Sequence, residues 1–117
     1  MNVNERIKKL EEITHLPVRQ DVYSGAESSY IVFTYSAEHP VLNGDDRVLF
    51  DEATIQVNLY TPMELNYMTL KHQIRDYLET IGIVESIETW VDTYVSNKNL
   101  EETKRHTAFT VNVTDGR

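Results

Sequence analysis

The sequence predicts an α+β protein: a mainly antiparallel sheet packed against one long helix, with its elements in the order α-β-β-β-α-β-β. Two segments, residues 30–37 and 48–60, alternate apolar and polar residues with a period of two, which places the apolar set on one face of a sheet. Directly after the second segment the period changes to that of a helix. Strands that are grouped together with few helices favour this fold class over an alternating one.

The length and composition are those of one globular domain, which we expect to span residues 1–117. The formal net charge is −8 at pH 7, so the chain lacks the excess of basic residues with which proteins grip nucleic-acid phosphates. There is no cysteine, which excludes disulfides, thiolate zinc sites and a cysteine nucleophile. The sequence shows neither a long apolar run nor a secretory signal. We therefore expect a soluble protein made in the cytoplasm, with no membrane contact.

The N-terminal part is predicted to hold one short helix and one short strand. Residues 3–14 carry a single apolar stripe at helical spacing, surrounded by charged side chains. The stripe consists of Val3, Ile7 and Leu10 and can extend to Ile13. Pro17 follows shortly after, as expected beyond a helix end. Residues 18–23 are then expected to form the first strand.

A long polar loop is expected between the two alternating strands. His39 and Pro40 should end the first of them, because proline cannot donate a hydrogen bond to a sheet. Residues 43–46 are turn formers, and the loop runs to Arg47. This connection is too long for a tight two-residue hairpin turn, so we expect it to project from the body of the protein.

The helix after the second strand has marked ends. Thr61 is expected to be its N-cap, with Pro62 at the first helical position and Glu64 completing a capping box. Gly82 is expected to stop the helix in a left-handed conformation. The apolar stripe between these ends consists of Met63, Tyr67, Leu70, Ile74, Tyr77 and Ile81.

Two further strands are predicted near the C-terminus. Residues 87–95 are rich in β-branched and aromatic side chains, including Trp90. Residues 105–114 alternate, with Phe109 in the apolar set and His106 in the other. A polar connection over residues 96–102 joins them.

The sequence offers no recognisable chemistry. The four glycines are too far apart to build a phosphate-binding loop. His72 and Asp76 share a face of the predicted helix, but a pair without a third ligand is more typical of a solvent-facing surface than of a metal site. We therefore expect no catalytic residue, no cofactor and no metal site.

Aromatic residues in the predicted strands allow two interpretations. They could stack on nucleic-acid bases, as aromatic side chains do in proteins that bind single-stranded nucleic acid. Such sites also need a basic groove. Because Lys and Arg are few and dispersed, packing in the core and across strands is favoured. The residues concerned are Tyr30, Phe33, Tyr35, Tyr60, Trp90, Tyr94 and Phe109.

Three segments resemble the tail terminator, or tail-to-head joining, proteins of long-tailed phages, the siphophage tail completion family. The first is the strand Ser29-Tyr30-Ile31-Val32-Phe33. The second is the strand of residues 55–61 that runs into a helix, and the third is the closing stretch KRHTAFTVNV, residues 104–113. The resemblance covers nearly the whole chain, and its motifs are structural rather than catalytic.

This resemblance implies an α+β fold and a virion structural protein that is not an enzyme. Such a protein completes the tail as a homo-oligomeric ring, expected to be a hexamer, on top of the tail-tube protein and joins it to the head connector. DNA passes through the ring without specific binding, and an acidic chain is compatible with that because it would not retain DNA. The protein would be assembled in the host cytoplasm and be found in the virion.

Partner contacts are expected on the two polar connections, because a closed ring needs two different complementary patches on each subunit. An ordinary surface loop is the alternative for both connections. We expect deletion of residues 41–46 to leave a folded monomer that fails to join heads to tails. The candidate contact residues are His39, Val41, Leu42, Asn43, Asp45, Asp46, Arg47, Asn97 and Lys98.

Other functions stay open on the sequence alone. A related neck or head-completion protein would share the size, the acidity and the fold. A stand-alone small α+β binding module could use the tyrosine-rich sheet for a small molecule or a peptide. An enzyme would need a site assembled from scattered carboxylates and His106, which the sequence does not indicate.

Overall fold

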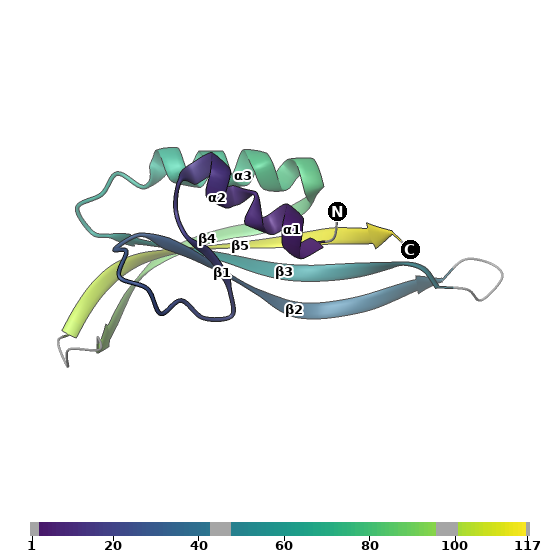
Figure 1. Ribbon diagram of the computed structural model, residues 1–117, viewed down its shortest axis with the longest axis horizontal. Helices are drawn as coiled ribbons and strands as arrows, with labels where there is room; N and C mark the ends of the chain where they lie inside the picture. The colour runs from purple at the N-terminus through teal and green to yellow at the C-terminus, as the bar shows by residue number, and fades with distance from the viewer. Residues whose placement is uncertain (1–2, 43–47, 96–100, 117) are drawn as a thin grey trace.

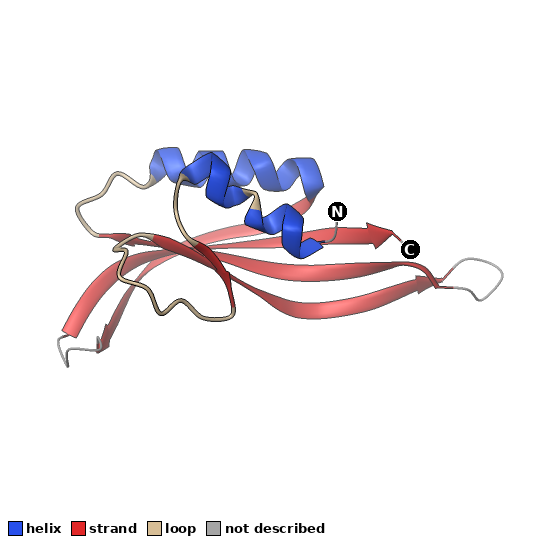
Figure 2. Cartoon of the chain, in the orientation of Figure 1, coloured by secondary structure: helices blue, strands red, loops and turns tan. Residues whose placement is uncertain are grey.

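The computed structural model describes residues 3–42, 48–95 and 101–116. Within these residues the chain forms one five-stranded sheet with helices on one face (Figures 1 and 2). The elements, in order, are α1 (Val3–Lys8), α2 (Leu10–Thr14), β1 (Val18–Gln20), β2 (Tyr30–Leu42), β3 (Val48–Pro62), α3 (Met68–Ile81), β4 (Gly82–Val95) and β5 (Glu101–Gly116).

The strands lie in the sheet in the order β1-β2-β3-β5-β4. Every pairing is antiparallel except that of β1, which runs parallel to β2 over three residues. The expected α+β class with a mainly antiparallel sheet is therefore confirmed. β4 forms one edge, while β1 covers only the segment Ile31–Phe33 of β2 at the other.

The core lies between the sheet and the helices. Strands β2, β3 and β5 point alternate side chains into it, as the period of two predicted. The central strand β3 contributes Ile55, Val57 and Leu59, and β5 contributes Phe109, Val111 and Val113; all six are fully buried. The opposite set of each strand lies on the face that no helix covers, which we call the outer face (Figure 2).

Three helices rather than one long helix cover the core face (Figure 1). α3 buries Ile74 and Leu78, while α1 and α2 bury Ile7 and Leu10 beside them. The Tyr77 hydroxyl donates a 2.7 Å hydrogen bond to the backbone carbonyl of α1 and so joins the two helical parts. The predicted N-terminal helix is thus present, with a break at one residue between α1 and α2.

The predicted start of the long helix is wrong. Thr61 and Pro62 are the last residues of β3, where they pair with Arg105 and Lys104 of β5, and α3 begins at Met68. A capping box is a local signal, and here the pairing of two long strands continues through it. The C-terminal part of the predicted apolar stripe, from Leu70 on, does face the core.

Gly82 does follow the helix directly, but its role differs from the predicted one. Its backbone is extended, with φ −172° and ψ −163°, and it is already the first residue of β4. A Cβ atom at this position would overlap the backbone carbonyl oxygen of Asn112 in β5. Glycine is therefore needed for the close approach of two strands rather than for a left-handed turn.

The expected break at His39 and Pro40 is also wrong, because β2 continues to Leu42. These residues pair with Glu52 and Asp51 of β3. β1 ends opposite Phe33, so β2 is an edge strand from there on. A proline is tolerated in an edge strand because its missing N–H costs no hydrogen bond to a second neighbour.

Glu11 holds the turn between α2 and β1, and its substitution should change the acid sensitivity of folding. Its carboxylate accepts hydrogen bonds from the backbone N–H of Val18 (3.1 Å) and from Arg19 (2.9 Å). These two contacts lower the pKa of Glu11 from its ordinary 4.5. A lowered folded-state pKa contributes stability above the ordinary value, and this stability is lost as the pH falls through the folded value.

We expect Glu11→Gln to cost about 0.5 kcal/mol at neutral pH, a small amount because solvent screens this exposed pair. The variant should also lose less stability than the natural chain as the pH falls below about 4.5, because its amide does not titrate. Urea unfolding at several pH values measures both effects. Glu12→Gln, at the adjacent exposed residue, is the control. If Glu11→Gln lost as much stability below pH 4.5 as the natural chain does, this explanation would be refuted.

Candidate functional site

The outer face of the sheet carries a continuous row of rings, three adjacent pairs of which are stacked and the fourth tilted. We call Tyr23, Tyr30, Tyr60, His106 and Trp90 the outer aromatic row. Adjacent ring centroids lie 4.4, 5.0, 4.3 and 4.2 Å apart along this order. Strand register builds the row, because the last four residues lie directly opposite one another on β2, β3, β5 and β4. The first ring comes from the connection between β1 and β2 and stacks on the end of the row.

His106 is the centre of a hydrogen-bond network beneath this row. Its Nδ1 lies 2.8 Å from Asp92 Oδ2 and its Nε2 lies 2.7 Å from Asn58 Oδ1. The Asn58 amide nitrogen donates to the Val32 carbonyl (3.1 Å), which fixes its oxygen toward the histidine. Trp90 Nε1 donates to Asp92 Oδ1 (2.6 Å). Both ring nitrogens of the buried histidine thus lie within hydrogen-bond distance of a side-chain oxygen, which fixes the orientation of the ring.

Lys104 also lies on the outer face, next to the outer aromatic row. Its ammonium stands 4.7 Å from the centroid of the Tyr30 ring, a cation–π distance, and donates to the backbone carbonyl of Ser28. Burial lowers the pKa of Lys104. The lysine therefore anchors the connection between β1 and β2 onto the sheet.

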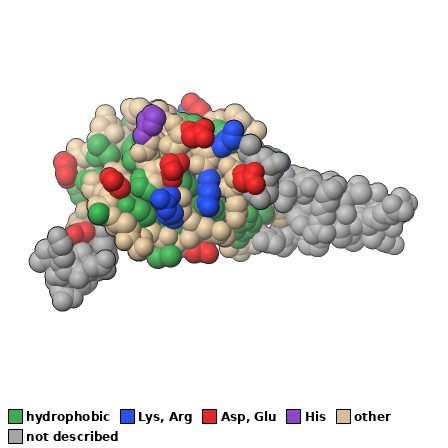
Figure 3. All heavy atoms as spheres, viewed as in Figure 1, with side chains coloured by type: hydrophobic (Ala, Val, Ile, Leu, Met, Phe, Trp, Pro, Cys, Tyr) green, Lys and Arg blue, Asp and Glu red, His purple; other side chains and the backbone are tan. Residues whose placement is uncertain are grey.

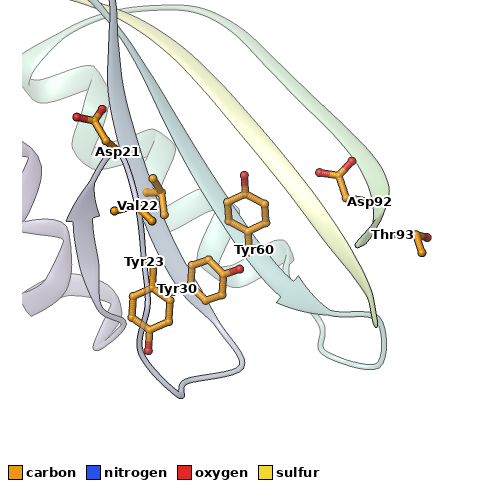
Figure 4. A pocket seen from close by; sticks show the side chains of 8 residues that line it. Asp21, Val22, Tyr23, Tyr30, Tyr60, Asp92 and Thr93 are labelled. Atoms are coloured by element: carbon orange, nitrogen blue, oxygen red, sulfur yellow. The ribbon is translucent and has the colours of Figure 1, made fainter. Parts of the chain in front are cut away.

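A groove of about 440 Å³ opens beside the row (Figure 4). Asp21 and Asp92 lie on opposite sides of it with Tyr60 between them (Figure 4). Burial raises the pKa of Tyr60, and the neighbouring Tyr30 and Asp92 raise it further. Within the described part of the chain, neither the Tyr60 hydroxyl nor the Asp21 carboxylate has a hydrogen-bond partner. The lining residues are Asp21, Val22, Tyr23, Tyr30, Val32, Tyr60, Asp92 and Thr93.

Three of the predicted partner-contact residues lie in a strand and are not among the groove's lining residues. His39, Val41 and Leu42 belong to β2 and pair with Glu52, Phe50 and Val48 of β3, so they are not part of a loop. The others lie outside the described residues, and their role stays a prediction. They are Asn43, Asp45, Asp46, Arg47, Asn97 and Lys98.

The predicted packing role of the aromatic residues is confirmed in two different settings. Phe33 and Phe109 are fully buried in the core. Tyr30, Tyr60 and Trp90 pack across strands on the outer face instead. Tyr35 packs against the core and donates to Asn4 Oδ1 (2.6 Å). The side chain of Tyr94 lies outside the described residues.

Sequence analysis missed the row and the groove as a site. Its residues come from segments more than 80 positions apart, and only the register of four strands brings them together. One usable signal was present: Tyr30, Tyr60 and His106 interrupt the polar sets of their strands with rings. An aromatic residue in the polar set of three strands indicates a shared surface, although it does not identify the neighbours.

Metal-binding geometry is not found in residues 3–42, 48–95 and 101–116, where no three potential ligands come together. His72 is exposed on α3, and Asp76 forms a 3.1 Å ion pair with Arg75. On the face seen in Figure 3, acidic and basic side chains are interspersed. None of the described helices has the length and apolar character that crossing a membrane requires.

Comparisons with known proteins give likenesses among solved structures. No family model matches the chain, and neither does a curated protein. Among solved structures, the chain is similar to one in the virion of a native gene transfer agent particle. The TM-score is 0.46 and the identity is 12%, over 97% of this chain and 92% of that chain. A likeness of this degree establishes neither a common family nor a common function.

Proposed function

We propose that this chain is a virion structural protein that completes a phage-like tail, forming a ring on the tail tube and joining it to the head connector. The sequence resemblance to tail terminator proteins supports this proposal. The structural observation that carries it is the pair of unlike free edges of the sheet. A ring of identical subunits in head-to-tail contact needs two such different surfaces on each subunit.

The two edges differ in length and in surroundings. β4 is an edge strand along its whole length, Gly82–Val95, and carries the exposed side chains Ile83 and Val91. On the opposite side, β2 is an edge from Thr34 onward. An edge strand presents backbone N–H and C=O groups that a neighbouring chain can pair with. The edges can therefore serve as the complementary patches of adjacent subunits.

The remaining parts of the proposal concern stoichiometry and partners. We take the ring to be a hexamer that DNA crosses without specific binding. Residues Asn43, Asp45, Asp46, Arg47, Asn97 and Lys98 are proposed to contact the tail-tube protein or the head connector. Because Val41 and Leu42 belong to β2, the appropriate deletion removes residues 43–46 and keeps the strand. That variant should form rings but fail to join heads to tails in an in vitro joining assay.

Ring formation is the direct test. Light scattering and negative-stain microscopy of the natural chain, alone and with purified tail tubes, should show rings or tube ends closed by a ring. Ile83→Lys places a charge on the β4 edge at a side chain that is 72% exposed, so the monomer should remain folded while rings are lost. Met68→Lys, 39% exposed on α3 rather than on an edge strand, is the matched control and should assemble normally.

Three results would count against the proposal. A natural chain that stays monomeric and never binds tail tubes would exclude the ring. Equal assembly of Ile83→Lys and the natural chain would exclude the β4 edge. Loss of assembly in both lysine variants would point to a general effect of charge rather than to the edge.

A further inference from the structure

We propose that the groove on the outer face binds the guanidinium group of an arginine side chain presented by a partner protein. This inference is separate from the proposed ring. It concerns side chains on the outer face of the subunit rather than backbone pairing at the sheet edges, although Asp92 comes from the edge strand β4. Three features of the groove carry it: the sign of its charges, the unpaired acceptors on its walls, and the apolar surface at its mouth.

The charged side chains that line the groove are both carboxylates. Asp21 comes from the residue after β1, and Asp92 comes from β4 on the other side. No lysine or arginine is among the eight lining residues. Lys104 is nearby, but its ammonium is held by the Ser28 carbonyl and the Tyr30 ring. The groove therefore favours a cation over a neutral or anionic ligand.

The polar groups on the walls need donors. The Asp21 carboxylate is an acceptor only, and within the described residues nothing donates to it. The Tyr60 hydroxyl lies between the two carboxylates and is likewise without a partner among those residues (Figure 4). Each oxygen of Asp92 accepts one hydrogen bond, from Trp90 or from His106, and keeps a further lone pair.

A guanidinium group matches these acceptors better than an ammonium does. It presents five N–H donors in a rigid plane and pairs with a carboxylate through two of them. Val22, which is 71% exposed at the groove, supplies apolar contact for the methylene groups of the side chain. These matches select arginine as the ligand.

The groove can be probed with a single blocked amino acid. We would titrate the natural chain, labelled for NMR, with N-acetyl-arginine amide, following backbone amide signals and tyrosine ring signals. The expected result is a saturable shift confined to Asp21, Tyr30, Tyr60, Asp92 and their neighbours. N-acetyl-citrulline amide has nearly the same shape without the charge, and N-acetyl-lysine amide has the charge without the plane. Both should bind more weakly than the arginine compound.

Two variants give the matched comparison. Asp21→Asn removes one charge at a residue with φ 67°, a conformation that asparagine adopts readily, so the fold should be kept. Glu79→Gln removes one charge from an exposed position on α3. Asp21→Asn should weaken binding of the arginine compound about two- to fivefold, the usual size of an exposed ion pair, and Glu79→Gln should leave it unchanged.

The possible contrary outcomes are distinct. Equal binding of the citrulline compound would show that charge plays no part, and equal binding of the lysine compound would refute the choice of guanidinium. Equal weakening by Asp21→Asn and Glu79→Gln, or shifts spread over the whole surface, would reduce the effect to the net charge of the chain. None of these results bears on ring formation, which is tested by Ile83→Lys.

Discussion

Phe109→Ala is expected to lower the free energy of unfolding by about 3–5 kcal/mol, the usual cost of removing a buried phenylalanine ring. Phe109 is fully buried in the core. It lies on β5 directly between Val57 of β3 and Ile87 of β4. Those neighbours are held by strand pairing on both sides, so the cavity cannot close by a movement of one side chain. The loss should therefore include a cavity term as well as the transfer term.

Urea unfolding followed by circular dichroism measures this loss. Met68→Ala is the control, because this side chain is 39% exposed at the start of α3 and its truncation should cost less than about 1 kcal/mol. A similar small cost for Phe109→Ala would contradict the placement of the core. If Phe109→Ala does not fold, Phe109→Leu should still fold, with a smaller loss of unfolding free energy. A Phe109→Leu variant as stable as the natural chain would contradict the placement of Phe109 in the core.

Gly82→Ala should destabilise the protein by about 1–3 kcal/mol, toward the upper end of the range for overpacking. The added methyl group would overlap the carbonyl oxygen of Asn112 and approach Val111 Cγ2 at 3.1 Å. The obstructing atom belongs to the backbone at the end of the β4–β5 pairing where β4 begins, so relief requires the two strands to separate there. The extended φ of −172° is open to any residue, and the cost is therefore steric rather than conformational.

Gly25→Ala is a matched control because its methyl group would also meet an atom at short range. That atom belongs to the end of the Tyr23 side chain, which can rotate away. The variant should lose the 2.8 Å hydrogen bond from the Glu27 N–H to the Tyr23 hydroxyl, worth about 1 kcal/mol. Thermal unfolding of both variants should rank Gly82→Ala as the less stable one. The opposite order would refute the steric explanation.

The alternation of apolar and polar residues predicted most of the fold. It identified the core sets of β3 and β5 correctly, since Ile55, Val57 and Phe109 are all fully buried. A period of two is a direct result of strand geometry, and it persists whatever the strand pairs with. For the same reason the strands were found where they are, although β4 begins earlier and β5 extends further than predicted.

Predictions from local signals, such as helix-capping residues and prolines, were less successful. Thr61 and Pro62 have the chemistry of a helix start, and Pro40 that of a strand end, yet all three lie in strands. In each case the outcome depends on the neighbouring strand. Pairing with β5 carries β3 through its capping residues, and the open edge of β2 tolerates a proline. Such effects belong to tertiary structure and cannot be derived from a short window of sequence.

The candidate site was even harder to predict from a short window of sequence. From the sequence, His106 was placed in the polar set of its strand and named as a group that an enzyme would need, but its hydrogen-bond partners were not identified. Its partners Asn58 and Asp92 are 48 and 14 residues away in the chain. The groove further requires Asp21, which enters through a connection whose course the sequence does not reveal. Composition indicated how many acidic and aromatic residues there are, whereas only the strand register indicates which of them meet.

The parallel pairing of β1 has a consequence for the order of events during synthesis. α1 and α2 lie on the core face, whereas the connection after β1 reaches the outer face, where Tyr23 stacks on Tyr30 (Figure 1). The N-terminal segment thus wraps around one side of the sheet. Its partners are all translated after it, including β2 and the Tyr77 hydroxyl of α3. The packing of the N-terminal segment therefore cannot be completed until α3 has been synthesised.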